Sequence, residues 1–149
     1  MSTTEIQKLD IETLLEKVRK IENFEVVGYE EDKILVAPVK GIIKVSPTDE
    51  EFKKFLGEAK RRRPRGKPSQ KQLQLLEQIV RKLVEEKTKF KITFEGKDII
   101  VRFDIDHFVK ITDKDIKVAG FQNENDGVLG SIYPLLSKYG KVLFLRVVK

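Results

Sequence analysis

The residues best suited to chemistry in this sequence form one short basic run near its middle. Six of the eight residues 60–67 are lysine or arginine, and none is acidic. The chain holds 30 Lys plus Arg against 24 Asp plus Glu, so the rest of it carries 24 of each and no net charge. The whole formal charge of +6 therefore comes from this run.

Basic side chains on an extended segment can bind successive phosphates of a nucleic acid. Arginine holds a phosphate through two parallel hydrogen bonds, and the prolines and glycine of this segment prevent it from continuing as a helix. A solvated linker would also contain Pro and Gly, but its like charges would repel one another without gain. We expect phosphate contacts from the basic arm, residues 60–68, and from the helix start that follows it: Lys60, Arg61, Arg62, Arg63, Arg65, Lys67 and Lys71.

Three aromatic side chains are candidates for stacking on unpaired bases. Most of the nine Phe alternate toward a core, whereas Tyr29 lies beside a turn, Phe108 lies in a strand-like segment and Phe121 lies in a polar loop. Each of the three also fits an ordinary core position. The sequence contains no consensus of the RRM type.

Two aspartates and the only histidine of the chain lie together at residues 104–107. Asp104 and Asp106 would share one face of a strand and could hold Mg²⁺, and their spacing resembles the first metal motif of archaeo-eukaryotic primases. A basic residue interrupts the apolar run before them, however, and no second histidine exists. Alternation explains the pattern equally well, with Phe103, Ile105 and His107 facing the core and the acids facing water.

Other signatures of enzymes are missing from the sequence. It contains no phosphate-binding glycine loop, no zinc-ligand spacing, and no nucleophile with His and a carboxylate in evident relation. We therefore expect a protein that is not an enzyme and that uses no cofactor and no metal.

Size and composition indicate one folded domain over residues 1–149. The chain is 40% hydrophobic, which is enough for a core, and it has no cysteine and no apolar run of the ~20 residues that span a bilayer.

The first ten residues lack the basic and apolar regions of a signal peptide, so we expect a cytoplasmic protein without membrane contact. Many Lys, Glu and Arg with one Met and no Cys or Trp are typical of hyperthermophiles, which favours a thermophilic source.

Hydrophobic periodicity and turn residues predict an α+β fold, with a largely antiparallel sheet and helices packed on one face. In the first half we expect a helix to about residue 20 capped by Thr3 or Thr4, strands at residues 24–29, 34–39 and 41–45, and a helix from Ser46 or Thr48 to about residue 57. In the second half we expect a helix from Ser69 to about residue 87, strands at 90–94, 99–106 and 108–111, a helix capped by Ser131 that ends at residue 139, and a strand at 141–149 that is buried on both faces.

The two halves of the sequence show a similar order of segments. The segments LLEKVRK, NFEVV, KILV and GIIKVSPTD are followed, in the same order, by LLEQIVRK, KFKIT, DIIV and HFVKITDKD. Phe24 matches Phe90 and Lys44 matches Lys110 at one offset of 66 residues. The sequence leaves open whether residues 1–59 and 69–149 are duplicated halves joined by the basic arm, or similar by chance.

A cysteine-free α+β chain of this length with a basic arm resembles the ThermoDBP-type single-stranded-DNA-binding proteins of thermophilic archaea. The carriers of the resemblance are residues 60–67 and the aromatic strands around residues 90–108. The resemblance implies a sheet with helices around a cleft, an apolar cleft interior and basic residues at its rim. That family can carry a C-terminal leucine zipper, whereas the sequence here ends in a strand-like segment.

These observations favour a non-catalytic protein that binds nucleic acid, with single-stranded DNA or RNA as the ligand. No predicted helix presents a recognition face for the major groove, which argues against duplex reading. The alternative is an interaction module whose arm docks an acidic partner and whose helix at residues 73–83 offers a face for a homodimer. A metal-dependent nucleotidyl-transfer or nuclease remnant at Asp104 is the third interpretation. We expect a monomer.

Overall fold

The computed structural model describes residues 6–39 and 66–145 of the chain. Within these ranges it contains three helices and eight strands. The helices are α1 (Ile11–Arg19), α3 (Gln70–Glu85) and α4 (Val128–Tyr139). The strands are β1 (Gln7–Leu9), β2 (Phe24–Glu30), β3 (Lys33–Pro38), β4 (Phe90–Glu95), β5 (Asp98–Arg102), β6 (Phe108–Ile111), β7 (Asp115–Ala119) and β8 (Lys141–Leu145).

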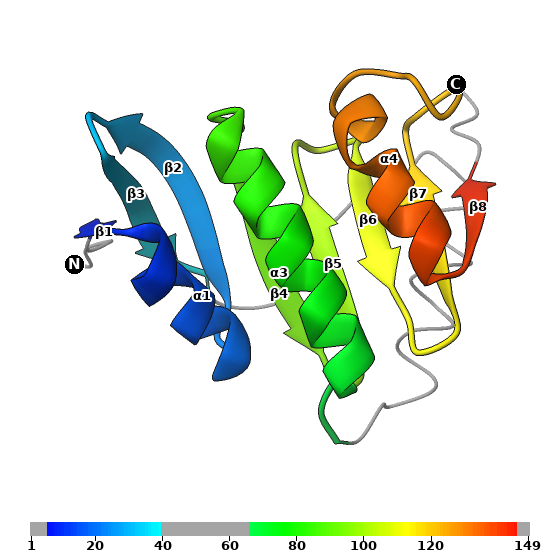
Figure 1. Cartoon of the computed structure of the whole chain (residues 1–149), viewed down its shortest axis with the longest axis horizontal. Helices are drawn as coiled ribbons and strands as arrows, with labels where there is room; N and C mark the ends of the chain where they lie inside the picture. Colours follow the sequence, from blue (N-terminus) through cyan, green and yellow to red (C-terminus); the bar gives the residue numbers. More distant parts are fainter. Residues whose placement is uncertain (1–5, 40–65, 146–149) are drawn as a thin grey trace.

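All eight strands belong to one open sheet in the order β1-β3-β2-β4-β5-β6-β7-β8. Each neighbouring pair is antiparallel except β7 and β8, which run parallel across the connection through α4. The helices α1, α3 and α4 lie side by side over the same face of the sheet (Figure 1). The predicted α+β class, with a largely antiparallel sheet and helices on one face, is therefore confirmed. None of the described helices is long and apolar enough to cross a membrane.

The core lies between the sheet and this helical layer. Alternate residues of each central strand point into it, as Ile92 of β4, Val101 of β5 and Val109 of β6 do in one row across the sheet. Helix α3 contributes a stripe of buried side chains that includes Leu76, Ile79 and Leu83. The stripe that was considered for a dimer face is therefore used within the chain.

The N-terminal helix begins later than predicted. Residues 7–9 pair with β3 as strand β1, and Asp10 caps α1 by accepting a hydrogen bond from the Thr13 backbone N–H at 2.8 Å. Hydrogen bonding by the Thr13 side chain, and next this backbone bond, lowers the pKa of Asp10 below its usual value. The prediction that Thr3 or Thr4 caps this helix is wrong, because the apolar residues before Asp10 serve a strand.

The C-terminal region departs from prediction in three ways. The structure adds a strand, β7, that the sequence reading did not identify. Helix α4 begins after Gly127, so Ser131 and Pro134 lie inside it instead of at its cap and first turn. Strand β8 is an edge strand whose residues are half-buried or exposed, so the prediction of burial on both faces is wrong for it. Strands β5 and β6 are instead buried on both faces along nearly their whole length.

The pairing of β2 with β4 is symmetric under the offset of 66 residues seen in the sequence. Phe24 pairs with Ile92 and Val26 pairs with Phe90, and adding 66 to Phe24 and Val26 gives Phe90 and Ile92. The two Phe rings pack edge to face with centroids 6.3 Å apart. The strand predicted at 41–45 and the helix predicted from Ser46 or Thr48 lie outside the described residues, so the likeness of the halves stays a prediction.

Candidate nucleic-acid interface

The predicted phosphate-binding residues that the structure describes lie at the start of α3. Lys67 and Lys71 are exposed, and Ser69 between them caps the helix in a reciprocal arrangement with Gln72. The Gln72 backbone N–H donates to the Ser69 hydroxyl at 3.2 Å, and the Ser69 N–H donates to the Gln72 side-chain oxygen at 2.8 Å. The other predicted residues of the arm lie outside the described ranges: Lys60, Arg61, Arg62, Arg63 and Arg65.

The topology brings further lysines to this end of the sheet. The turn between β4 and β5, the turn between β6 and β7, the end of α4 and the start of β8 all lie at the same end as the start of α3. Six exposed lysines lie on these segments and on the residues just before α3. We call this group the lysine end, and it consists of Lys67, Lys71, Lys97, Lys114, Lys138 and Lys141.

Close contacts join the segments of the lysine end directly. An added Cβ at Gly66 would lie 3.8 Å from Lys97 Cε, so the arm leaves beside the β4–β5 turn. The Lys71 ammonium lies 4.7 Å from the centre of the Tyr139 ring, which is a cation–π contact. A Cβ at Gly140 would lie 3.0 Å from the Lys114 carbonyl oxygen, so the end of α4 is close to the β6–β7 turn.

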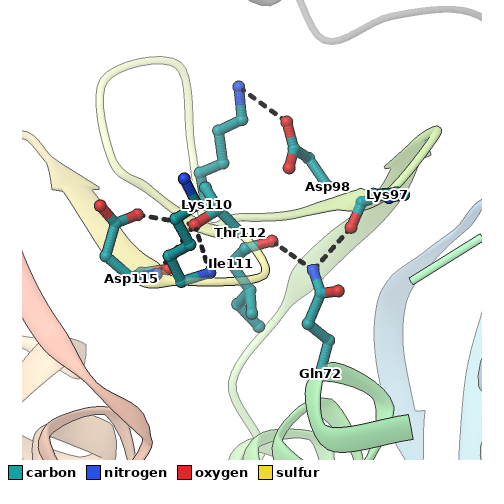
Figure 2. Close-up of polar contacts among 8 residues, drawn as sticks. Gln72, Lys97, Asp98, Lys110, Ile111, Thr112 and Asp115 are labelled. Carbon is teal, nitrogen blue, oxygen red and sulfur yellow. Dashed lines mark hydrogen bonds and ion pairs between the residues drawn. The ribbon is translucent and has the colours of Figure 1, made fainter. Parts of the chain in front are cut away.

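Buried polar contacts hold the β4–β5 and β6–β7 turns in place (Figure 2). The Gln72 side chain has no exposed surface, and its Nε2 donates to the Lys97 carbonyl at 2.6 Å and to the Ile111 carbonyl at 3.0 Å. One side chain of α3 thus fastens both the β4–β5 turn and the end of β6. The Asp98 carboxylate and the Lys110 ammonium, both buried, form an ion pair at 3.4 Å.

The β6–β7 turn is closed by its own side chains. The Thr112 hydroxyl donates to the Asp115 carboxylate at 2.6 Å, and it accepts from the backbone N–H of Lys114 and Asp115. The Tyr139 hydroxyl donates to the Thr112 carbonyl at 2.6 Å. Burial, reinforced by the charges of Asp113 and Asp115, raises the pKa of Tyr139 to about 12. The turn that carries Lys114 is therefore fixed from two sides.

The six lysines of the lysine end form no ion pair with a carboxylate of the described residues. Lysines elsewhere, such as Lys17 and Lys82, do form such pairs. Of the acids at this end, Asp98 is neutralised by Lys110, Asp115 is bound by Thr112, and Asp113 is exposed. The ammonium groups are consequently available to an external anion.

The three aromatic candidates lie away from the lysine end or inside the protein. Phe108 is 1% exposed, and Phe121 is 6% exposed and packs against the rings of Phe103 and His107. Tyr29 is half-buried near the end of α3, where its hydroxyl donates to the Thr88 carbonyl at 2.6 Å. In this conformation the protein itself covers the faces of the two Phe rings, so we assign base stacking to neither of them.

Residues 103–106 form bends between β5 and β6 instead of continuing the strand. Asp104 Oδ1 accepts from the backbone N–H of Asp106 and His107 and lies 2.7 Å from His107 Nδ1. Partial burial acts to raise the pKa of Asp104, but the hydrogen bonds from His107 and Asp106 lower it overall. Ile105 is 61% exposed, so the expectation that it faces the core is wrong. Among the described residues no group of three or more His, Cys, Asp or Glu is arranged to hold a metal.

Sequence reasoning found Lys67 and Lys71 but missed Lys97, Lys114, Lys138 and Lys141. Each of these four is an isolated lysine at a turn or an element end, and only the sheet order brings it beside the others. No protein-family model matches the chain, and no curated protein or solved structure is significantly similar to it.

Proposed function

We propose that this protein binds nucleic acid without chemical conversion, with single strands favoured, through phosphate contacts from the lysine end and the basic arm. One observation carries the proposal. Six exposed lysines from separate segments have no carboxylate partner among residues 6–39 and 66–145, and they gather at the end of the sheet where residues 66–68 of the basic arm lie. Unpaired like charges repel one another, and an external polyanion relieves that repulsion while releasing its own counterions.

The network under the lysine end supports this assignment. Gln72 and Tyr139 fix the backbone of the β4–β5 and β6–β7 turns, and the Lys110–Asp98 ion pair joins the strands beside them, so the lysines extend from defined backbone positions. Lysine acts on phosphate as a point charge and reads no base. The proposed contact therefore supplies affinity and salt dependence but no sequence preference.

The test compares two triple variants that change net charge equally. One replaces Lys97, Lys114 and Lys141 by Gln, and the control replaces Lys8, Lys33 and Lys87, which lie on β1, at the β2–β3 turn and after α3. Each neutralised contact to a single strand contributes a slope of about −0.7 in log K against log salt, so the first variant should flatten the slope by about 2. Fluorescence anisotropy with a single-stranded oligonucleotide at several salt concentrations measures this.

The control triple should keep nearly the slope of the unaltered protein. Equal weakening by both triples would assign binding to diffuse charge and overturn the role of the lysine end. Absence of binding to single strand, duplex and RNA alike would overturn the proposed function. Tight binding of a polyglutamate peptide in that case would favour an acidic protein partner instead.

A further inference from the structure

A groove lies at the other end of the β4–β5 hairpin from the lysine end. It has a volume of about 390 Å³, which is within the range of small-molecule sites. Its walls come from β2, from the start of β4, and from the end of β5 with the bends after it: Glu25, Val26, Val27, Lys89, Phe90, Lys91, Arg102, Phe103, Asp104 and Ile105.

The groove exists because β2 separates from β4. The two strands pair only from Phe24 to Val26, and a β-bulge follows between Val26 and Gly28. A bulge bends its strand and increases its twist. Figure 1 shows β2 curving away from β4 beyond this point. The side chains at the divergence are left with space between them.

Two cations of the groove have no carboxylate partner among the described residues. Lys91 pairs with Glu25 at 3.9 Å. The Asp104 carboxylate is occupied by His107 and by two backbone N–H groups. Lys89 is exposed and forms no ion pair with a described residue. In the described part of the chain Arg102 bonds only through its Nε, which donates to the Asp104 carbonyl at 2.9 Å. The terminal nitrogens of Arg102 can therefore bind an anion.

Apolar side chains lie beside these cations. Ile105 is 61% exposed, which is unusual for a large aliphatic residue, and Val27 and Phe103 are half-buried in the same groove. An anion site next to exposed apolar surface matches a nucleotide, because a phosphate and the face of a base are joined within one ligand.

We propose that this groove holds one unstacked nucleotide of a single strand, with its base against Val27, Phe103 and Ile105 and its phosphate at Lys89 and Arg102. This inference rests on the proposed function and gives it a physical basis for strand selection. Bases in a duplex are stacked and paired, so only a single strand can place a base face in the groove without first unpairing.

The first experiment probes the groove without an oligonucleotide. Thymidine 5′-monophosphate is titrated into the protein while amide NMR signals are followed, with thymidine and ribose 5-phosphate as controls that lack the phosphate or the base. We expect shifts of the amide signals of Lys89, Arg102 and Ile105. Each control should bind about tenfold more weakly, because ribose 5-phosphate loses the base contact, which is worth about that factor, and thymidine loses the phosphate contact. Equal binding of ribose phosphate would reduce the groove to an anion site, and absence of shifts there would overturn the proposal.

The second experiment uses a matched pair of substitutions. Ile105→Glu places a negative charge at the groove, and Ile6→Glu makes the same change at a residue that is 58% exposed next to β1. We expect I105E to lower the affinity for single strands about tenfold and to leave the affinity for duplex unchanged. We expect I6E to change neither affinity. An I105E variant that binds single strands normally would overturn the groove proposal and leave the lysine end intact. A protein that binds thymidine monophosphate in the groove but no oligonucleotide would overturn the proposed function instead.

Discussion

Gln72 is a polar side chain with no exposed surface, and it explains how one residue can organise the lysine end. Its amide nitrogen donates to carbonyls of Lys97 and Ile111, and its oxygen accepts from Ser69 N–H. All three polar groups that it satisfies belong to turns or element ends. Their partners would otherwise have to come from water, which has little access to the buried bond at the Ile111 carbonyl.

Replacing Gln72 by Leu should therefore destabilise the protein although Leu has a similar size and is apolar. The change leaves two carbonyls and one N–H without partners, and we expect a loss of about 3 kcal/mol in the free energy of unfolding. Chemical denaturation measures it. The control Gln74→Leu alters an exposed residue of the same helix and should stay within about 0.5 kcal/mol of the unaltered protein. Equal stability of Q72L and Q74L would show that the Gln72 network is unimportant.

At the residue scale, the sequence predicts what depends on near neighbours. Ser69 is readable as a helix cap because its partner Gln72 is three positions away. The bonds from Gln72 to Lys97 and Ile111 span 25 and 39 residues, and no local pattern marks them. The same limit applies to Lys110, a residue of a charged type that is 4% exposed because Asp98 of the neighbouring strand neutralises it.

At the element scale, Tyr29 ties strand β2 to the end of α3. Its hydroxyl donates to the Thr88 carbonyl, and burial raises its pKa to about 12 from the ordinary 10.0. Because the folded-state pKa is the higher one, the stabilisation is fully present below pH 10 and is lost as the pH rises toward 12. Tyr29→Phe should cost about 1 kcal/mol at pH 8, and the difference from the unaltered protein should shrink between pH 10 and 12.

Denaturant unfolding at several alkaline pH values tests this prediction. Tyr133→Phe is the control, because the Tyr133 hydroxyl makes no hydrogen bond with the described residues. Its free energy of unfolding at pH 8 should match that of the unaltered protein within about 0.5 kcal/mol. A Y29F variant as stable as Y133F at pH 8 would contradict the assigned role of the Tyr29 hydroxyl.

The type of an element could be predicted where the hydrophobic residues of its segment follow a single consistent period. The hairpins at β2–β3 and β4–β5 and the stripe of α3 follow from alternation and helical spacing. The structure forms these elements, although β5 is buried on both faces and does not alternate. Element ends were less predictable, because several residues can cap the same helix. Asp10 is the cap of α1 instead of Thr3 or Thr4, since residues 7–9 gain more from pairing with β3. The apolar run of β8 indicated burial, but its side chains meet α4 and solvent at the sheet edge.

At the scale of the whole molecule, the lysine end and the groove lie at opposite ends of one hairpin. Lys91 in the groove and Lys97 in the turn are six residues apart on the β4 segment, which corresponds to about 20 Å at 3.3 Å per residue. A single strand that reaches both sites would cover several nucleotides, consistent with the lower range of site sizes for sheet-based binders. The sequence predicted the basic arm but not this arrangement, because the order of strands in the sheet decides it.

The basic arm adds four arginines to the lysines that the sheet presents. If the arm contacts phosphates, replacing Arg61, Arg62, Arg63 and Arg65 by Gln should weaken binding to every sequence alike. Four lost contacts should flatten the salt slope for a single strand by about 3, and the fold should survive because these residues lie outside the apolar stripes and hairpins of the sequence. Anisotropy titrations over several salt concentrations and sequences measure both quantities, with circular dichroism as the check on folding.

Three outcomes of that experiment have different meanings. Unchanged affinity and slope would make the arm a linker and leave the lysine end and the groove as the proposed phosphate sites. A strong effect for one sequence alone would mean that the arginines read bases, which a segment interrupted by two prolines and a glycine is poorly suited to do. A uniform loss that adds to the loss from the Lys97, Lys114 and Lys141 triple would show that arm and lysine end contact different phosphates, since independent contacts add in free energy.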